Sequence, residues 1–326
     1  MTDTRLWGKK VWVAGHRGLV GSALLRRLQR ESCQVLTVTS ENVDLRRQHP
    51  TEDWMAREKP DIVFVAAARV GGIGANSAYP ARFLYDNLMI AANIMHASYL
   101  SGVEKLIFLG STCIYPRDAA QPIKESALLC GPLEVTNEPY ALAKIAGIKL
   151  AQAYRREYGC NFISVQPTNL FGPGDNFNLE NSHVLPALIR KAHDAKLAGA
   201  PIMTVWGTGR PLREFLHVDD LADALVFLAK NYDEGDPINV GSGEELSIAA
   251  LAELVCSVVG FTGRLEFDPS RPDGTPRKLA DISRLRSQGW RSRISLRAGI
   301  ESTYRWYLDH GFSGEFANSS QDVLAG

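Results

Sequence analysis

Two side chains that could deliver a proton to a carbonyl oxygen stand near the middle of the chain. Tyr140 and Lys144 are four residues apart in Tyr-Ala-Leu-Ala-Lys, a spacing that places both on one face of a helix. An ammonium beside a phenol favours the phenolate, so the pKa of Tyr140 is predicted to fall from ~10 toward neutrality. Ser111 follows the apolar run 105–109, a predicted strand, and could hydrogen-bond the same oxygen. The Tyr-x-x-x-Lys pattern is common in helices, so its meaning depends on the surrounding sequence.

A glycine-rich turn lies near the N-terminus, between a predicted strand at 10–14 and a predicted helix at 20–31. In Gly15-His-Arg-Gly18-Leu-Val-Gly21, the first glycine allows a tight turn, the second lets the backbone approach a pyrophosphate, and the third lets the helix pack closely on the strand. The N-terminus of the helix attracts the phosphate charge. Because strand, turn and helix follow in the required order, the motif predicts a dinucleotide site rather than an ordinary turn.

The charges near the second strand indicate which dinucleotide is preferred. Proteins that choose NAD usually place a carboxylate about 20 residues after the glycines, and the segment 37–40, Thr-Val-Thr-Ser, contains none. Arg17 in the glycine loop could pair with the ribose phosphate of NADP, which predicts NADP(H); a solvated loop charge is the alternative. Asp44 and Leu45 could contact the adenine, and Asp44 could equally cap a helix.

The elements that would position these residues alternate between short apolar strands and longer helices. This alternation predicts an α/β fold: a Rossmann-type doubly wound parallel sheet, with helices on both faces and ligands beyond the carboxyl ends of its strands. From about residue 173 onward Pro and Gly cluster and the pattern loosens. We expect an NADP-binding domain over 1–172, with a return of the chain at about 214–240, and a smaller C-terminal α/β substrate domain over 173–326. The other predicted strands are 35–38, 61–66 and 162–166, and the other predicted helices are 81–100 and 140–158.

The composition argues against several classes of protein. The 326 residues include 36 Lys and Arg and 36 Asp and Glu, and this zero net charge argues against a general nucleic-acid binder. The first ten residues lack the apolar core of a signal peptide, and no apolar stretch approaches the ~20 residues that span a bilayer. Five cysteines without a Cys-x-x-Cys pair predict neither a disulfide framework nor a metal site. We expect a reduced, cytoplasmic protein that does not bind a membrane.

Longer runs of the sequence are similar to one family. The chain resembles the extended short-chain dehydrogenase/reductases, and within them the bifunctional enzymes that act on GDP-4-keto-6-deoxy-D-mannose. The resemblance extends from about Lys9 to His310 and is carried by the runs GHRGLVGSAL, ARVGGIGAN, FLGSTCIYP, TNEPYALAKIAGIKL, PTNLFGPGDNF, NSHVLPALIRK, VWGTGRPLREFLHVDDLA and DGTPRK. It implies an NADPH-dependent 3,5-epimerisation and 4-reduction that yields GDP-L-fucose. The alternatives are an epimerase or reductase of another nucleotide-4-keto sugar, and a non-catalytic NADP sensor of the same fold.

The resemblance implies roles for individual residues. Ser111, Tyr140 and Lys144 match the reductase triad. Cys113 matches the base that removes a proton beside the carbonyl, and His183 matches the acid that returns a proton to the opposite face. A thiolate with a lowered pKa and a histidine suit these two steps. Without the resemblance, Cys113 would be interpreted as a small buried apolar residue and His183 as a hydrogen-bonding group at a helix start.

The same resemblance implies two sets of binding residues. Those expected to bind NADP(H) are Gly15, His16, Arg17, Gly18, Leu19, Val20, Gly21, Ser40, Asp44, Leu45, Leu109, Gly110, Tyr140, Lys144, Pro167, Thr168, Asn169, Leu170 and His183. Those expected to bind the GDP-sugar are Lys191, Trp206, Arg213, Asp273 and Lys278. The family leads us to expect arginine at position 191 and near Ser40. Lys191 keeps the positive charge but lacks the planar guanidinium group that can form two parallel hydrogen bonds to the substrate. Without an arginine near Ser40, the preference for NADP depends more on Arg17. The family also implies a homodimer in which the helices at 81–100 and 140–158 form a four-helix bundle.

Overall fold

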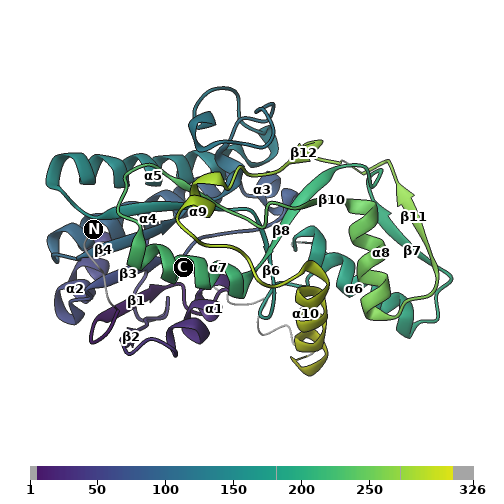
Figure 1. Cartoon of the computed structure of the whole chain (residues 1–326), viewed down its shortest axis with the longest axis horizontal. Helices are drawn as coiled ribbons and strands as arrows, with labels where there is room; N and C mark the ends of the chain where they lie inside the picture. The colour runs from purple at the N-terminus through teal and green to yellow at the C-terminus, as the bar shows by residue number, and fades with distance from the viewer. Residues whose placement is uncertain (1–5, 181, 272, 311–326) are drawn as a thin grey trace.

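The computed structural model describes residues 6–180, 182–271 and 273–310, and its largest element is a six-stranded parallel sheet (Figure 1). The strands lie in the order β2-β1-β3-β4-β5-β9. Their bounds are β1 (Lys10–Ala14), β2 (Gln34–Leu36), β3 (Ile62–Val65), β4 (Lys105–Leu109), β5 (Phe162–Pro167) and β9 (Ile238–Val240). The strand order reverses between β1 and β3, and ligands of open α/β sheets bind at such a reversal.

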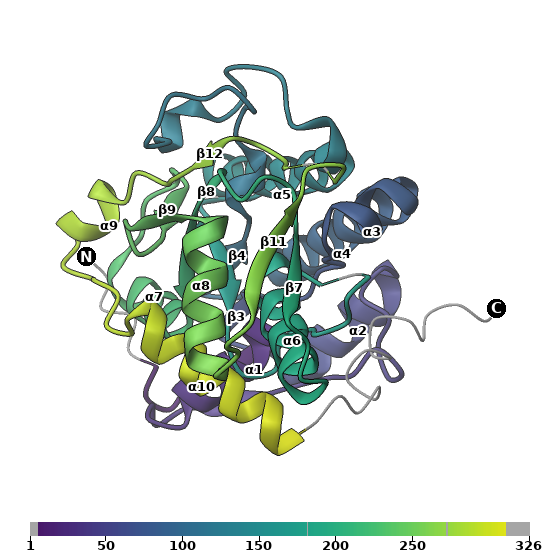
Figure 2. The same ribbon diagram turned by 90° about the vertical axis from the view of Figure 1, so that its right-hand side faces the viewer.

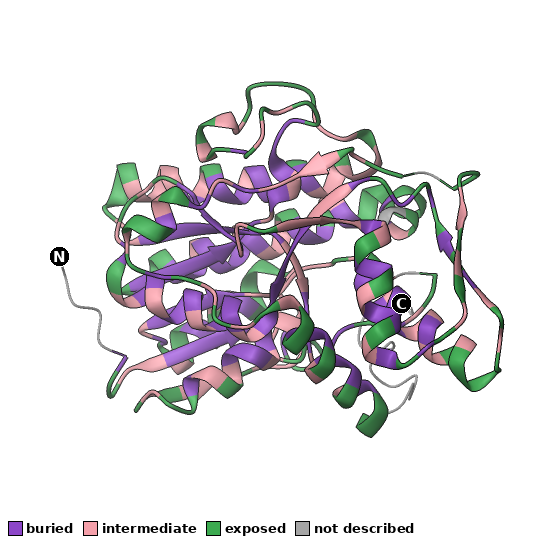
Figure 3. Ribbon diagram, turned by 45° about the vertical axis from the view of Figure 1, so that its right-hand side comes forward, coloured by how far each residue is buried: buried purple, intermediate pink, exposed green. Residues whose placement is uncertain are grey.

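Helices cover both faces of this sheet. β3 and β4 are buried along their whole length, as expected for central strands with a helical layer on each side. α2, α4 and α5 pack on one face, and α1 and α7 pack on the other (Figures 1 and 3). Within these layers α4 contacts α5, and α1 contacts α7. The bounds are α1 (Leu19–Leu28), α2 (Gln48–Glu58), α4 (Pro80–Leu100), α5 (Glu138–Tyr158) and α7 (Val218–Asn231).

A second group of elements continues from the carboxyl end of β5. β6 (Asn169–Phe171) follows β5 after one residue and pairs with β8 (Leu212–His217), which also pairs with β10 (Glu245–Ser247) and β12 (Arg277–Lys278). A separate apolar core lies among three helices and a two-stranded sheet (Figure 2). These elements are α6 (Val184–Leu197), β7 (Ile202–Trp206), α8 (Ile248–Val259), β11 (Arg264–Asp268) and α10 (Leu296–His310). The short helices are α3 (Ile73–Ala78), α9 (Ser283–Ser287) and the 3₁₀ turns η1 (Thr112–Ile114), η2 (Glu125–Ala127) and η3 (Val135–Asn137).

The sheet confirms the predicted fold class, with differences in detail. The strand predicted at 35–38 ends earlier, at Leu36, and the helix predicted at 20–31 ends at Leu28. α2 had no predicted counterpart, because its sequence QHPTEDWMARE buries only Thr51, Trp54 and Met55 and shows no apolar stripe. α7 and β9 belong to the layers of the large sheet although α6 precedes them in the chain.

The described residues offer neither a membrane-spanning helix nor a cluster of metal ligands. None of the described helices combines the length and apolarity that crossing a membrane requires. No group of three or more His, Cys, Asp or Glu side chains in the described parts of the chain is arranged to hold a metal ion.

Candidate active site

The glycine loop closes the turn between β1 and α1. Gly15 has φ +83°, a conformation that favours glycine, and a Cβ there would lie 2.6 Å from the backbone of Ala67, just after β3. A Cβ at Gly21 would lie 2.0 Å from the carbonyl oxygen of Gly15. A Cβ at Gly18 would meet only that oxygen, at 3.4 Å. Two glycines therefore form the turn, and the third leaves open space at the point where the strand order reverses.

This turn fits the diphosphate of a dinucleotide. Gly18 is the N-cap of α1 and no side chain caps the helix, so the N–H groups of the first turn suit an anion. The Nδ1 atom of His16 is buried and has no hydrogen-bond partner among the described residues. Arg17 and Glu41 form an exposed ion pair at 3.3 Å. Glu41 lies one residue beyond the carboxylate-free segment 37–40, so sequence reasoning missed the carboxylate that pairs with Arg17.

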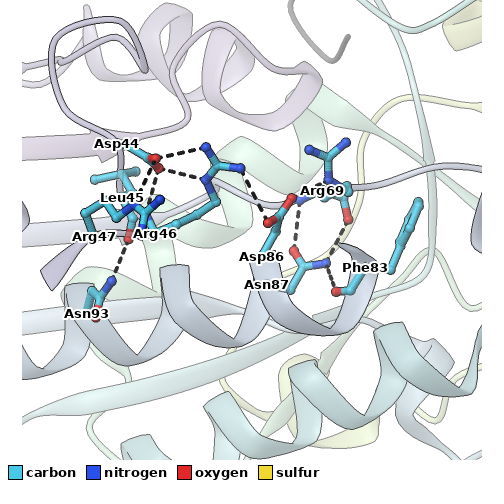
Figure 4. Close-up of polar contacts among 9 residues, drawn as sticks. All are labelled: Asp44, Leu45, Arg46, Arg47, Arg69, Phe83, Asp86, Asn87 and Asn93. Atoms are coloured by element: carbon cyan, nitrogen blue, oxygen red, sulfur yellow. Dashed lines mark hydrogen bonds and ion pairs between the residues drawn. The ribbon is translucent and has the colours of Figure 1, made fainter. Parts of the chain in front are cut away.

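Charged side chains tie the loop after β2 to α4 (Figure 4). Arg46 donates two hydrogen bonds to the Asp44 carboxylate, at 2.9 and 2.8 Å, and lies 3.6 Å from the carboxylate of Asp86 on α4. Arg69, which follows β3, donates to the same Asp86 carboxylate at 2.6 Å. Asp86 is buried between the two guanidinium groups. The loop expected to contact the adenine is therefore anchored on the loop after β3 and on α4.

Asp44 and Leu45 are held by contacts that exclude helix capping. Asp44 accepts a hydrogen bond from the backbone N–H of Arg46 at 3.0 Å, and the Arg46 side chain holds the pKa of Asp44 below its usual range. Arg47, not Asp44, is the N-cap of α2, so the capping alternative is wrong. The carbonyl oxygen of Leu45 accepts from the side chain of Asn93 on α4, at 3.0 Å (Figure 4).

Ser111 lies two residues after β4 and is oriented by β5. Its backbone N–H donates to Gln166 Oε1 at 3.0 Å. A Cβ at Gly110 would lie 1.8 Å from that oxygen, so glycine is required for this contact. The hydroxyl of Ser111 accepts from the backbone N–H of Cys113 at 3.2 Å. Gln166 was absent from the predicted site, although a polar residue inside the apolar strand Phe-Ile-Ser-Val-Gln-Pro was a signal for it.

Tyr140 and Lys144 lie on one face of α5, but their electrostatics differ from the prediction. Lys144 is buried, donates to the carbonyl oxygen of Leu109 at 2.8 Å, and has a pKa that burial lowers to about 7. Burial raises the pKa of Tyr140 above its ordinary value, the Cys113 thiolate raises it further, and the Ser111 hydroxyl opposes both. The prediction that Lys144 lowers the pKa of Tyr140 is wrong, because the ammonium points to Leu109 and burial disfavours its charge.

Cys113 lies in η1 and contacts a cation from the far end of the chain. Its Sγ is 3.2 Å from Nζ of Lys278 on β12. Burial raises the pKa of the thiol, but Lys278, Ser111 and Arg213 outweigh it, so the pKa lies below its ordinary value. Positive surroundings of this kind are typical of reactive cysteines, not of inert ones. Lys278, which the resemblance assigns to the GDP-sugar, here contacts the thiol.

His183 lies at the start of α6 but does not cap it. The residue is the N-cap, its side chain makes no capping hydrogen bond, and it is exposed. Desolvation of the ring by the surrounding protein disfavours the charged imidazolium and lowers the pKa of His183. The segment 167–170, which we expect to bind the cofactor, is fixed by contacts with β8 and β9. The N–H of Thr168 donates to the carbonyl oxygen of Val240, at 3.0 Å, and the side chain of Asn169 donates to the carbonyl oxygen of Glu214, at 2.8 Å.

Lys191, Trp206 and Arg271 form a basic and aromatic surface on the C-terminal elements. Nζ of Lys191 lies 4.5 Å and the guanidinium carbon of Arg271 lies 4.9 Å from the ring centre of Trp206, distances typical of cation–π contacts. Trp206 is about half exposed, at 51%. Asp273 accepts two hydrogen bonds from Thr208, both at 2.7 Å. Arg271 was not predicted, and no spacing rule pointed to it.

Fold and site together define a class of protein, a dinucleotide-binding α/β protein with a polar site at the carboxyl end of β4. This site combines a hydroxyl, a phenol, an ammonium and an activated thiol, from Ser111, Tyr140, Lys144 and Cys113. The chain belongs to the NAD dependent epimerase/dehydratase family, whose model matches residues 11–241. The family predicted from the sequence is thereby confirmed.

Individual relatives are similar over nearly the whole chain. The GDP-L-fucose synthase of Sinorhizobium fredii is 56% identical over 303 residues, which are 93% of this chain and 96% of that protein. GDP-L-fucose synthase 1 of Arabidopsis thaliana is 58% identical over 300 residues, 92% of this chain and 93% of that protein. A solved GDP-L-fucose synthetase from Naegleria fowleri bound to NADP is 32% identical, with a TM-score of 0.86 over 93% of this chain and 95% of that one. The similarity therefore includes the C-terminal elements that lie beyond the family match.

Proposed function

We propose that the chain is a bifunctional, NADPH-dependent enzyme that converts GDP-4-keto-6-deoxy-D-mannose to GDP-L-fucose by 3,5-epimerisation and 4-reduction. Its identity of 56% and 58% to two GDP-L-fucose synthases supports this substrate and product. The observation that carries the two-step chemistry is the Cys113 thiol, which contacts Lys278 and lies beside Ser111 and Tyr140. A simple ketone reductase has no step that needs an activated thiol there.

One oxygen-binding site serves both half-reactions. The raised pKa of Tyr140 keeps the phenol protonated near neutral pH, so it donates a hydrogen bond to the sugar carbonyl, with the Ser111 hydroxyl as the second donor. The two donors stabilise the negative oxygen of an enolate, and Tyr140 protonates that oxygen when carbon four is reduced. When bound, NADPH supplies the hydride for carbon four.

Cys113 and His183 carry out the proton exchange. Carbons three and five flank the carbonyl, so their protons are acidic. The Cys113 thiolate removes one of them, and the C–H electron pair moves to the carbonyl oxygen. His183 returns a proton to the opposite face of the same carbon. Because the pKa of His183 is lowered, the proton return slows as the pH rises above that pKa.

The other residues bind and orient the two nucleotides. The open side of Gly18 and the N-terminus of α1 receive the diphosphate of NADP(H). When NADP(H) binds, Arg17 leaves the Glu41 carboxylate and pairs with the ribose phosphate. The surface formed by Lys191, Trp206 and Arg271 offers positive charge and an aromatic face to guanosine diphosphate.

Identification of the product tests this function. The enzyme is incubated in D2O with GDP-4-keto-6-deoxy-D-mannose and NADPH, and the sugar is analysed by NMR. We expect GDP-L-fucose with deuterium at carbons three and five. A product changed at carbon four alone would show a reductase without epimerase activity and would contradict the two-step function. Binding of NADPH without turnover of this or related sugars would indicate a sensor.

The assignment of the base predicts a selective defect. Cys113→Ser is expected to abolish deuterium incorporation at carbons three and five while NADPH still binds, because serine is a far weaker base than a thiolate. NMR of the recovered sugar and fluorescence titration of NADPH measure the two properties. The exposed Cys130→Ser is the matched control and is expected to exchange normally. Retained exchange in Cys113→Ser would contradict the assignment.

We further propose a cytoplasmic homodimer. α4 and α5 pack together and carry exposed apolar residues, including Leu88, Tyr99, Leu142 and Tyr158. A second copy of the chain could cover them with the same two helices, forming a four-helix bundle. The five cysteines are free, which is typical of a reducing compartment.

A further inference from the structure

Lys278 reaches the catalytic thiol through the pairing of two short strands. β12 pairs in parallel with β8, so that Lys278 lies opposite Arg213. The buried Glu214 carboxylate fixes this arrangement, since it accepts from the backbone N–H of Ala280 at 3.0 Å. Nζ of Lys278 then lies 3.2 Å from Sγ of Cys113. The contact joins residues 165 positions apart and holds the ammonium on the thiol.

Other charged and titratable groups also face Cys113. Arg213 on β8 acts in the same direction as Lys278, and Tyr140 on α5 interacts electrostatically with the thiolate. A small enclosed cavity adjoins the thiol, and its charged lining residues are Arg117, Glu134, Arg277 and Lys278. Glu134 already accepts from the backbone and hydroxyl of Thr136, at 3.3 Å each. Cations therefore dominate the surroundings of the thiol, and among the described residues only Lys278 forms a hydrogen bond to the sulfur from another element.

We infer that Lys278 is a positioning residue that holds Cys113 as a thiolate and aims it at the sugar ring. This inference deepens the proposed function and rests on it. In the step that it serves, the C–H bond at carbon three or five breaks, its electron pair moves to the carbonyl oxygen, and the proton forms an S–H bond on Cys113. Lys278 contacts the sulfur, so in this step it acts through Cys113.

Thiol titration tests the inference without substrate. The full-length protein is alkylated with iodoacetamide between about pH 5 and 10, and peptide mass spectrometry follows each cysteine separately. Lys278→Met is expected to raise the alkylation midpoint of Cys113 by about one pH unit or more, whereas Lys278→Arg keeps it low. Lys278→Gln, a second neutral variant, is expected to behave like Lys278→Met. Exposed Cys130 is the internal control, and its profile stays constant if the fold is intact. An unchanged Cys113 midpoint in both neutral variants overturns the inference.

Deuterium exchange provides a second, substrate-dependent measurement. At about pH 7, Lys278→Met is expected to exchange carbons three and five roughly ten-fold more slowly than wild type, and to recover as the pH rises. A lysine that only binds the diphosphate would instead raise KM at every pH and leave the pH profile of kcat in place, which overturns the inference. If wild-type enzyme shows no exchange with this sugar, the proposed function fails, while the thiol titration still decides what Lys278 does to Cys113.

Discussion

At the scale of single residues, the two acidic groups beside the carbonyl influence each other. Burial raises the pKa of Tyr140 most, and the negative charge of Cys113 raises it further, so the phenol is a weak acid before the substrate binds. In the proposed mechanism, removal of a carbon-bound proton converts the thiolate to a neutral thiol, and the effect of its charge on Tyr140 is lost. Tyr140 therefore becomes a stronger hydrogen-bond donor when the enolate oxygen acquires its charge. Ser111, which contacts Cys113, lies between the two groups and supports the same oxygen.

Loss of the phenol should affect reduction more than proton exchange. Tyr140→Phe is expected to lower kcat for NADPH oxidation by about 10²–10⁴, because the alkoxide loses its proton donor. Deuterium exchange should fall less, since Ser111 remains as a donor, and the Kd for NADPH should change little. Stopped-flow absorbance and NMR measure the two rates. Tyr158→Phe, exposed on the same helix, is the control. A Tyr140→Phe enzyme with normal reduction would remove Tyr140 from the mechanism.

Asp175 predicts a pH dependence of stability. Burial raises its pKa to about 7, its Oδ2 has no partner among the described residues, and its Oδ1 accepts from the N–H of Asn176 at 2.8 Å. Between the unfolded pKa of ~4 and the folded pKa the native state binds more protons, so stability falls as the pH rises through this range. Asp175→Asn is expected to raise the free energy of unfolding by about 2 kcal/mol near pH 8 and hardly at all near pH 5. Urea unfolding at both pH values tests this, with the exposed Asp118→Asn as control. An equal effect at both pH values would contradict it.

At the scale of elements, local sequence patterns predicted where strands lie in the chain better than they predicted which strands pair. The strands expected at 10–14 and 105–109 have those bounds, because polar residues limit their apolar runs. α2 was missed because most of its surface is polar. The contact of Lys278 with Cys113 depends on the pairing of the two-residue β12 with β8, and no local pattern encodes that pairing. The resemblance therefore brought Lys278 into the site, whereas its contact with Cys113 was not predicted.

The link between the loop after β2 and α4 gives a prediction for an element. Asp86→Ala leaves Arg46 and Arg69 without the buried carboxylate between them. We expect it to lower the free energy of unfolding by about 2–4 kcal/mol and to raise the Kd for NADPH several-fold, because the loop that carries Asp44 loses its anchor. Denaturant unfolding and fluorescence titration measure both. Asp118→Ala breaks an exposed pair and should cost less than about 0.5 kcal/mol. Equal losses in the two variants would refute a special role for Asp86.

At the scale of the whole molecule, the active site is assembled from both halves of the chain. Cys113 and Tyr140 come from the layers of the large sheet, whereas Lys278 and His183 come from elements that follow β6. β8 connects the halves, since it pairs with β6 on one side and carries Arg213 toward the thiol. The sequence loses its regular alternation of strands and helices after residue 173, where we expect the substrate domain to begin. It did not predict Gln166 as the group that orients Ser111, because burial within β5 is a property of the assembled sheet.

The proposed dimer connects the surface of the molecule to this site. Tyr140 and Leu142 are two residues apart on α5, so a partner that covers Leu142 would also restrain the helix that carries the phenol. Sedimentation velocity is expected to show a dimer for wild type and a monomer for the double variant Leu88→Glu and Leu142→Glu, because two charges per chain would be buried at the interface. Activity should fall together with dimer content. Leu197→Glu, at an exposed position on α6, should keep both. A fully active wild-type monomer would show that the single chain completes the site by itself.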